Sequence, residues 1–430
     1  MKDNFQIITI IVFIVAALFG ILVFSGVISL GGSGAPGGQG TVILWGTFKN
    51  EVMSPLVETM NAQNPSFVLK YEEKSAETYD QDLLEALASG VGPDMFFMPD
   101  DLAFRYKDRV FALPADSYPI SAFQNNFAGA GEVFLTDKGM MAFPITIDPL
   151  VMYYNRSTLD ANGIVYPPED WEEFALLTET LTKKDETNRI LKSSAALGHF
   201  SNVTNAKGIL SMLFMQGGNP IVTEQAGNRI STLDNYTSVY SLEPILKFYT
   251  DFADPLHPTY SWNKSLPPSR DAFSAENLAF YFGYASELSS LAARNPNQNF
   301  LVAPVPQIKG SNFKSTSARV NGIAVSAFSK NFETAFIAAG TMTSGDFAKN
   351  LSAKLGVAPA RRDLLASMPN DSFSPTFYSS ALFARGWLDP APKETENIFR
   401  IMVESVLSNN RSLADALRDA SAKLSVLLRK

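Results

Sequence analysis

Residues 41–101 read TVILWGTFKNEVMSPLVETMNAQNPSFVLKYEEKSAETYDQDLLEALASGVGPDMFFMPDD, and this stretch decides the fold. Three short apolar runs in it, at 41–45, 67–71 and 95–98, are rich in residues that favour β-structure. Runs of this length and composition predict buried strands.

Two segments between these runs have the periodicity of helices. Apolar residues fall on one face of residues 51–64 and of residues 79–89, and Gly90 follows the second segment. The order strand, helix, strand, helix, strand predicts an α/β layer with a parallel sheet. Ligands of such sheets bind at the carboxyl ends of the strands, which here are the loops 46–50 and 99–103.

The rest of the chain continues the mixture of strands and helices. Further strands are expected at 151–154, 300–305 and 323–326, and a long helical and irregular region is expected up to about residue 299. The remaining expected helices are 169–181, 331–344 and a pair over 393–429 that is broken near Asn409.

Length and composition limit the classes of protein that fit. A chain of 430 residues with 46% hydrophobic and 18% charged residues fits two domains or one bilobed unit. The net charge is −8 and no dense Lys/Arg stripe occurs, which argues against nucleic-acid binding. Cysteine is absent, and only His199 and His257 are histidines, so neither a thiolate or His-rich metal site nor a cofactor is expected.

The N-terminal segment predicts a membrane anchor. Residues 5–30 are apolar, and no charged residue occurs between Asp3 and Lys49. As a helix this segment spans about 39 Å, against about 30 Å for the hydrocarbon core of a bilayer. We expect an uncleaved transmembrane helix in 1–30 rather than a cleaved signal peptide, followed by a flexible Gly-rich linker at 31–40 and a body outside the cytoplasm.

Five segments follow one another along the chain in a fixed order. They are ILWGTF (43–48), LASGVGPDMFFMPDD (87–101), MMAFPITIDPLVMYYNRSTLDANGI (140–164) with PPEDWEEF (167–174), FYFGYASELSSL (280–291) with FLVAPVPQ (300–307), and VNGIAVSAFSKNFETAFIAAGTMTS (320–344) with GVAPARRDLL (356–365). In this order they resemble extracellular solute-binding proteins of family 1, the group that contains maltose-binding protein. Each motif is weak alone, and their ordered series from residue 41 onward makes the resemblance specific. Two departures are Asp170, where the family pattern has Thr, and Tyr284, where it has Trp.

The resemblance implies a two-lobed periplasmic-binding-protein fold of type II, with ligand held between the lobes. Lobe one would comprise 41–147 plus 320–368, and lobe two 148–319 plus 369–430. Residues 146–149 would form the first hinge. The implied function is capture of a small solute, most simply a sugar or oligosaccharide, by a monomer that delivers it to the permease subunits of an ABC importer.

A sugar site combines carboxylates and amides, which bond to hydroxyl groups, with flat aromatic faces, which pack on the ring. The resemblance places candidates of both kinds at the expected cleft, and no catalytic residue is among them. Asp100 competes with Asp101 for one position, and a loop tryptophan is as often packing as ligand-binding. The candidate ligand-binding residues are Thr47, Phe48, Asp101, Asp148, Trp262, Tyr284, Ser286, Asn321 and Trp387.

Two rival functions stay open at this level. A carbohydrate-active enzyme of the cell envelope would require two carboxylates about 5–9.5 Å apart. The adjacent acids Glu72 and Glu73 do not form such a pair, because neighbouring residues of a strand point to opposite faces. A sensor or scaffold that keeps the fold without the ligand is the other alternative.

Overall fold

A computed structural model of the chain describes residues 40–225, 228–234 and 241–429. The anchor expected at 1–30, and all but the last residue of the linker expected at 31–40, lie outside these ranges. Within the described ranges, no helix is both long enough and apolar enough to cross a membrane.

The chain divides into two compact units. Unit 1 comprises the chain up to Ile147 together with Val320–Leu355 and Pro359–Ala366. Unit 2 comprises Asp148–Arg319, Gly356–Ala358 and the chain from Ser367 onward. Two strands, β6 and β13, contain residues of both units.

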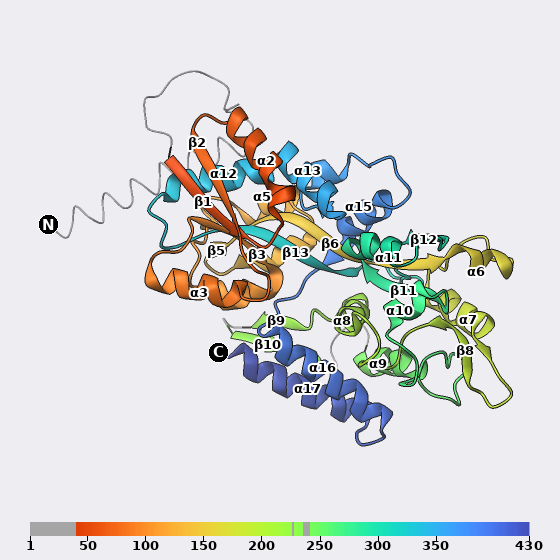
Figure 1. The fold of residues 1–430 in the computed structure, drawn as a ribbon. Coiled ribbons are helices and arrows are strands. Elements are labelled where there is room, and N and C mark those ends of the chain that lie inside the picture. Colours follow the sequence, from red (N-terminus) through yellow and green to blue (C-terminus); the bar gives the residue numbers. More distant parts are fainter. Residues whose placement is uncertain (1–39, 226–227, 235–240, 430) are drawn as a thin grey trace. The chain divides into compact units, whose positions relative to one another are not determined.

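Unit 1 is built on the sheet that the opening stretch of sequence predicts. Strand β1 (Gly40–Gly46) pairs in parallel with β2 (Phe67–Glu73) on one side and with β3 (Met95–Pro99) on the other. Strand β13 (Thr316–Val325) runs antiparallel to β3. The three parallel strands lie side by side in Figure 1. The predicted strand at 323–326 is therefore the end of a longer strand.

The helices of unit 1 pack through the faces that their periodicity predicts. Helix α2 (Asn50–Gln63) buries Met53 and Leu56 and packs on β2, and α3 (Tyr79–Ser89) ends at Gly90 in the left-handed conformation with φ 72°. The other elements of unit 1 are η1 (Asp100–Leu102), α4 (Ala103–Tyr106), α5 (Ile120–Asn126), η2 (Gly129–Phe134), β4 (Leu135–Thr136), β5 (Gly139–Met140), α12 (Phe332–Thr343), α13 (Asp346–Leu355) and α14 (Arg362–Leu365).

Unit 2 has a mixed sheet. Its central strand β11 (Leu278–Tyr284) is antiparallel to β6 (Phe143–Asn155) and parallel to β8 (Ile190–Ala195). Strand β12 (Phe300–Ala303) pairs antiparallel with β6, and the short β7 (Lys183–Lys184) with β8. Every residue of β6 and of β11 is buried. The sequence of β11, LAFYFGY, is a continuous apolar run of the kind that fully buried strands have, whereas β6 also contains Thr146, Asp148 and Asn155.

The departure from the family pattern at Asp170 keeps its structural role. Helix α7 (Trp171–Leu181) begins directly after Asp170, and the side chain of Asp170 accepts a hydrogen bond from the Glu173 amide at 2.9 Å. Glu173 in turn accepts from the Glu169 amide at 3.1 Å. An aspartate caps a helix as well as a threonine does.

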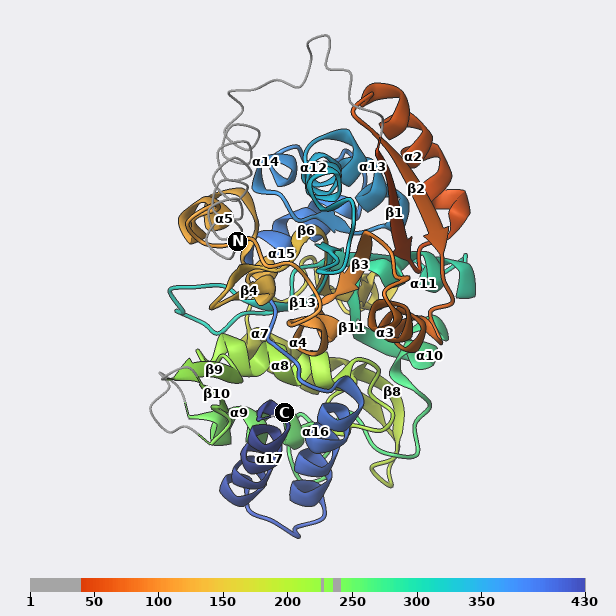
Figure 2. The same ribbon diagram turned by 90° about the vertical axis from the view of Figure 1, so that its left-hand side faces the viewer.

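The C-terminal tail forms the expected helix pair. Helices α16 (Pro392–Leu407) and α17 (Leu413–Leu428) lie side by side (Figure 2), with the break between them at 408–412. They pack on α8 (Ala206–Gln216) and α9 (Leu242–Asp251). The remaining short elements are α6 (Arg156–Ala161), β9 (Val222–Gln225), β10 (Asn228–Ser231), α10 (Ser269–Ser274), η3 (Ala285–Glu287), α11 (Leu288–Arg294), β14 (Ala358–Pro359), α15 (Ser374–Phe383) and β15 (Ala384–Arg385).

Candidate functional site

The candidate residues of unit 1 lie at one edge of its sheet. Strands β1 and β3 are parallel, so the segment Thr47–Phe48 after β1 and the segment Asp100–Asp101 after β3 leave the sheet at the same edge. Asn321 of the returning strand β13 pairs with Pro99, the last residue of β3. The structure therefore brings the unit 1 candidates to the edge where ligands of α/β sheets bind.

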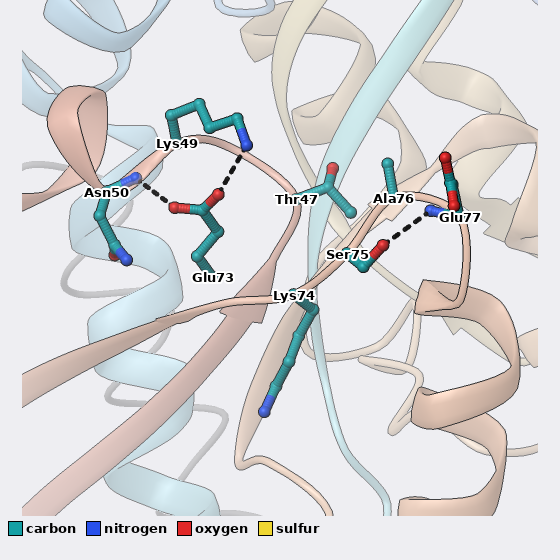
Figure 3. Close-up of a pocket in the computed structure, with 8 residues that line it drawn as sticks. All are labelled: Thr47, Lys49, Asn50, Glu73, Lys74, Ser75, Ala76 and Glu77. Carbon is teal, nitrogen blue, oxygen red and sulfur yellow. Dashed lines mark hydrogen bonds and ion pairs between the residues drawn. The ribbon is translucent and has the colours of Figure 1, made fainter.

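A pocket of about 570 Å³ opens beside β1 and β2 at this edge (Figure 3). Glu73 organises one wall, because its carboxylate accepts from the Asn50 amide at 2.7 Å and pairs with Lys49 at 3.0 Å. The lining residues are Thr47, Lys49, Asn50, Glu73, Lys74, Ser75, Ala76 and Glu77. The wall thus offers hydroxyl, amide and paired charged groups.

Phe48 is fixed in place by its backbone and by its ring. The Phe48 carbonyl accepts a hydrogen bond from the Tyr71 hydroxyl at 2.6 Å. The Phe48 ring meets Phe97 edge-on, with ring centroids 4.8 Å apart. The side chain is half-buried, so part of the ring stays accessible.

The two neighbouring aspartates after β3 differ in their surroundings. Asp101 is exposed on the 3-10 turn η1. Asp100 is half-buried and accepts a hydrogen bond from the Val320 amide at 3.1 Å, so it ties this turn to β13. Asp100 therefore has a structural role, whereas the more exposed carboxylate is that of Asp101.

In unit 2 the structure brings together two of the candidates, Asp148 and Ser286, which are 138 residues apart. The Asp148 carboxylate accepts from the Ser286 amide at 2.9 Å and from the Ser286 hydroxyl at 2.6 Å. Burial raises the pKa of Asp148 to about 6, although the bonds from Ser286 and the nearby Arg319 guanidinium work in the opposite direction. Asp148 is 9% exposed, while Ser286 is exposed.

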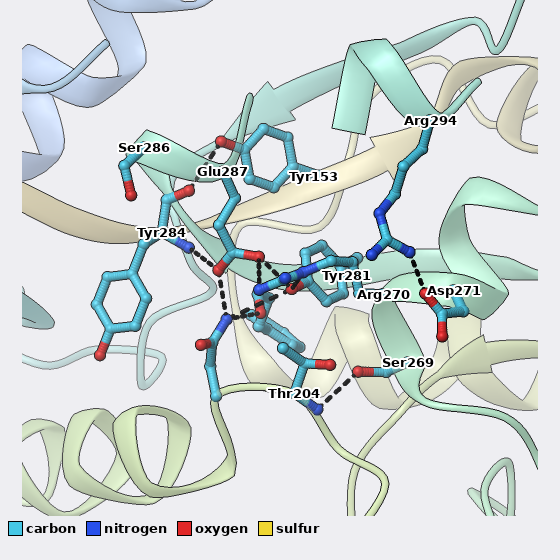
Figure 4. A network of polar contacts seen from close by, with 12 residues as sticks. Tyr153, Thr204, Ser269, Arg270, Asp271, Tyr281, Tyr284, Ser286, Glu287 and Arg294 are labelled. Atoms are coloured by element: carbon cyan, nitrogen blue, oxygen red, sulfur yellow. Dashed lines mark hydrogen bonds and ion pairs between the residues drawn. The ribbon is translucent and has the colours of Figure 1, made fainter. Parts of the chain in front are cut away.

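A buried network under Ser286 holds this turn (Figure 4). The Glu287 carboxylate accepts from the Tyr281 hydroxyl at 2.6 Å, from the Tyr284 amide at 3.0 Å and from Asn205 Nδ2 at 2.6 Å. It also pairs with Arg270 at 2.6 Å. These four partners fix the turn that presents Ser286 to Asp148.

Tyr284 packs against the first turn of α8. A Cβ atom on Gly208 would lie 2.4 Å from the Tyr284 hydroxyl oxygen, so only glycine allows this approach. The guanidinium of Arg319 lies 3.8 Å from the centroid of the Tyr284 ring. Tyr284 is 6% exposed and Arg319 covers one face of its ring, so the ring has little open stacking surface.

Trp387 reaches the same helix. Its indole nitrogen donates to the Ser211 hydroxyl at 3.1 Å, and its ring stacks on Phe399 with centroids 6.1 Å apart. Lys207, which precedes Gly208, places its ammonium 5.5 Å from the centroid of the Trp387 ring. Tyr284 and Trp387, 103 positions apart, therefore both contact the N-terminal half of α8.

Trp262 does not have the exposure that a stacking role requires. It is 1% exposed, because the amides of Ser261 and Trp262 both bond to the Phe252 carbonyl and fold this loop against the end of α9. For Trp262, which the sequence offers as a candidate ligand-binding residue, this burial favours the packing alternative.

Residues near this site that the sequence reasoning missed are Lys207, Gly208, Arg319 and Glu396. Lys207 carries the one charge in the largely apolar sequence AKGILSMLFMQ of α8, and an isolated charge in such a helix indicates a buried partner. Glu396 is exposed but lies close enough to Lys207, Asp389 and Arg319 to feel their charges, and partial desolvation raises its pKa. Within the described residues, no group of three His, Asp or Glu side chains is arranged to hold a metal ion.

Comparison with known proteins gives one family and several similar folds. The family described as bacterial extracellular solute-binding protein matches residues 46–344. A maltotriose-binding protein of Pyrococcus abyssi is 26% identical over 155 residues, which cover 35% of this chain and 32% of the relative. A binding protein of Brucella abortus is 26% identical over 120 residues, 27% of this chain and 28% of the relative. The chain thus aligns with about a third or less of these relatives.

Solved structures share the fold over most of the chain. A cyclo/maltodextrin-binding protein complexed with maltotetraose is 16% identical with a TM-score of 0.72, and the match covers 91% of this chain and 98% of the other. The sugar-binding protein MalE from Xanthomonas citri is 17% identical with a TM-score of 0.73, over 90% and 97% of the two chains. These matches show the periplasmic-binding-protein architecture.

Proposed function

Because this chain belongs to the bacterial extracellular solute-binding protein family, we propose that it captures a small carbohydrate outside the cytoplasm and delivers it to an ABC importer. The observation that carries the carbohydrate class is the arrangement around the first turns of α8, where Tyr284 packs against Gly208 and Trp387 bonds to Ser211. Aromatic rings pack on the apolar face of a sugar, and carboxylates bond to its hydroxyl groups.

Each proposed contact has a chemical role. The carboxylate of Asp148 accepts hydrogen bonds from sugar hydroxyls. The exposed Ser286 hydroxyl beside it, which donates to Asp148, can accept a hydrogen bond from the sugar. Trp387 offers the ring face that Phe399 does not cover, and Tyr284 contributes its hydroxyl, since Arg319 covers part of its ring. In unit 1 the proposed contacts are Thr47, Phe48, Asp101 and Asn321.

The ligands in solved structures of similar fold support a sugar as the ligand class. Besides the maltotetraose complex, these include an ABC transporter solute-binding protein bound with α-D-tagatose, a substrate-binding protein in complex with cycloalternan, and a receptor in complex with acarbose. The family is one of binding proteins rather than enzymes.

The proposed location is the outer face of the cell membrane. The apolar segment 5–30 anchors the chain as a transmembrane helix, and the Gly-rich segment up to residue 40 tethers the body. The partners are then the permease subunits of the importer. Cell fractionation tests the anchor: the full chain is expected in the membrane fraction, and a chain without residues 1–39 in a soluble fraction. Recovery of both chains in the same fraction contradicts the anchor.

A thermal-shift screen of the full chain tests ligand capture, in a detergent whose headgroup is not a sugar. The panel contains maltotriose, maltotetraose, smaller sugars, amino acids, polyamines and divalent metal ions. A ligand that binds the folded state raises the melting temperature by mass action. We expect a saccharide to do so, and Asp148→Asn and Trp387→Ala to remove the effect.

Two exposed residues of unit 2 provide matched controls. Asp160→Asn changes an exposed aspartate, and Tyr166→Ala removes an aromatic ring that is 80% exposed. Both variants are expected to keep the saccharide response. A response to amino acids or metal ions alone, or a saccharide response that survives Asp148→Asn and Trp387→Ala, contradicts the proposal.

A further inference from the structure

Trp387 sits in a segment with little regular structure of its own. Residues 386–391 connect the two-residue strand β15 to helix α16. The indole is half-buried, with its nitrogen bonded to Ser211 and its ring on Phe399. A connecting segment is normally more mobile than the helices around it. An additional constraint is therefore needed to hold the ring in one orientation.

A buried ion pair lies two residues beyond Trp387. The Lys207 ammonium bonds to the Asp389 carboxylate, and their side chains are 16% and 9% exposed. The same ammonium bonds to the Thr395 hydroxyl at 2.7 Å and to the Pro392 carbonyl at 3.2 Å. Lys207 thus fastens the connecting segment and the first turn of α16 to α8.

Asp389 also accepts hydrogen bonds from residues that follow it in the chain. The Thr395 hydroxyl lies 2.9 Å from each Asp389 oxygen and donates to the carboxylate. The Ala391 amide donates to Asp389 at 3.1 Å. Asp389 therefore links the connecting segment to the first turn of α16, and Lys207 joins both to α8.

Helix α8 supplies both the ammonium and the hydroxyl that Trp387 meets. Lys207 and Ser211 are four residues apart, so their side chains lie on the same helix face one turn apart. The ion pair fixes the segment at Asp389, and the Ser211 bond fixes the indole at Trp387. Two attachments to one helix face determine the orientation of the ring.

We propose that Lys207, Asp389 and Thr395 form a clamp that positions Trp387 for ligand stacking. The effect of the clamp on ligand affinity rests on the proposed sugar-binding function, whereas the clamp itself does not. Lys207 and Asp389 act as positioning residues and do not themselves contact the ligand. A buried ion pair adds little stability compared with an apolar pair of similar volume, so its conformational role is the informative one. Fixing the ring before binding lowers the ordering cost of association.

Fluorine NMR of the full chain labelled with 5-fluorotryptophan tests the clamp without any ligand. The sequence contains four tryptophans, and Trp387→Phe assigns the resonance of interest. In Lys207→Met, which keeps a stem of similar length without the charge, and in Asp389→Asn, this resonance is expected to shift and broaden. The other three resonances are expected to stay in place, which reports that the fold is intact.

Further variants separate a charged clamp from simple packing. Lys207→Arg keeps the charge and is expected to keep a sharp Trp387 resonance. Lys247→Met removes the cation of an exposed pair with Asp251 in the same unit and is expected to change nothing. If Lys207→Met fails to fold, Thr395→Val removes the shared hydroxyl but keeps both charges, and broadening of the same resonance is expected. An unchanged Trp387 resonance in the folded clamp variants overturns the proposal.

Affinity for maltotetraose is the second measurement. If the wild-type chain binds this probe, Lys207→Met and Asp389→Asn are expected to weaken binding by about tenfold, the size of one aromatic contact. Unchanged affinity in these variants overturns the link between clamp and stacking. If the wild-type chain does not bind maltotetraose, this result counts against the proposed ligand and not against the clamp. The fluorine measurement tests the clamp independently of any ligand.

Discussion

The buried carboxylate of Asp148 predicts a specific dependence of stability on pH. Its pKa is raised from 3.8 to about 6, chiefly by burial. Arg319 and the two bonds from Ser286 lower the pKa, and the charge of Glu287 raises it. At ~1.4 kcal/mol per pH unit, the ionised form is less stable in the folded chain by about 3 kcal/mol.

The sign follows from proton binding. Between pH 3.8 and about 6 the folded chain holds the Asp148 proton more often than the unfolded chain does. The free energy of unfolding therefore falls as pH rises through this window. His199 has the opposite effect, because burial lowers its pKa from 6.5 to about 4, so its contribution rises with pH over nearly the same range. In the wild type the two slopes largely cancel.

Substitutions reveal the two contributions separately. Asp148→Asn resembles the protonated acid, so near pH 4 its free energy of unfolding is expected to equal that of the wild type. Near pH 7.5 it is expected to exceed the wild-type value by up to about 3 kcal/mol. In His199→Asn only the contribution of Asp148 remains of the two, so the free energy of unfolding is expected to fall as pH rises from about 4 to 6. Ser286→Ala removes a bond that favours the ionised form and is expected to move that slope to higher pH.

Urea unfolding of the full chain from pH 3.5 to 7.5 measures these differences. The exposed Asp116→Asn is the matched control and is expected to differ from wild type by less than about 0.5 kcal/mol throughout. A difference between Asp148→Asn and wild type that stays constant with pH would refute the reasoning, because it would mean that Asp148 has the same pKa in both states.

Two further variants probe the supports of the unit 2 site. Gly208→Ala places a methyl group 2.4 Å from the Tyr284 hydroxyl, so we expect a loss of about 1–3 kcal/mol in urea unfolding and weaker saccharide binding; unchanged stability would show that Tyr284 moves freely. Glu287→Gln leaves Arg270 without its buried partner, and a loss of about 3–5 kcal/mol is expected. The exposed Glu179→Gln of α7 is the control and is expected to cost less than about 0.5 kcal/mol.

Much of the fold could be predicted because local pattern and burial agree. The three strands and two helices expected over 41–98 match β1, α2, β2, α3 and β3 to within two residues. The break near Asn409 separates α16 from α17, as expected. The weaker prediction was the extent of strands: residues 143–150 of β6 contain Pro and Asp, and their extended conformation comes from pairing with distant strands.

The candidate site was harder to predict because its contacts join distant segments. The resemblance places Asp148 at the expected cleft, and a buried acid needs a partner. The structure supplies Ser286, although no local pattern links the two residues. Trp262 and Trp387 both looked like loop tryptophans, yet the structure buries Trp262 and leaves Trp387 half-buried. Exposure is decided by tertiary packing, so sequence could not separate them.

The polar groups of unit 2 show a common arrangement that bears on function. Among the described residues of unit 2, each buried carboxylate is held by a protein partner: Asp148 by Ser286, Glu287 by Arg270 and Asp389 by Lys207. A carboxylate with such partners keeps its orientation, so little freedom is lost when a ligand binds. The aromatic rings are fixed by neighbouring groups in the same way. For the proposed sugar ligand, a site held in this way would select by the positions of hydroxyl groups, because a ligand that misplaces one would leave a buried group without its bond. We therefore expect discrimination between stereoisomeric sugars to depend on the groups behind Asp148 and Trp387 as much as on the contacts themselves.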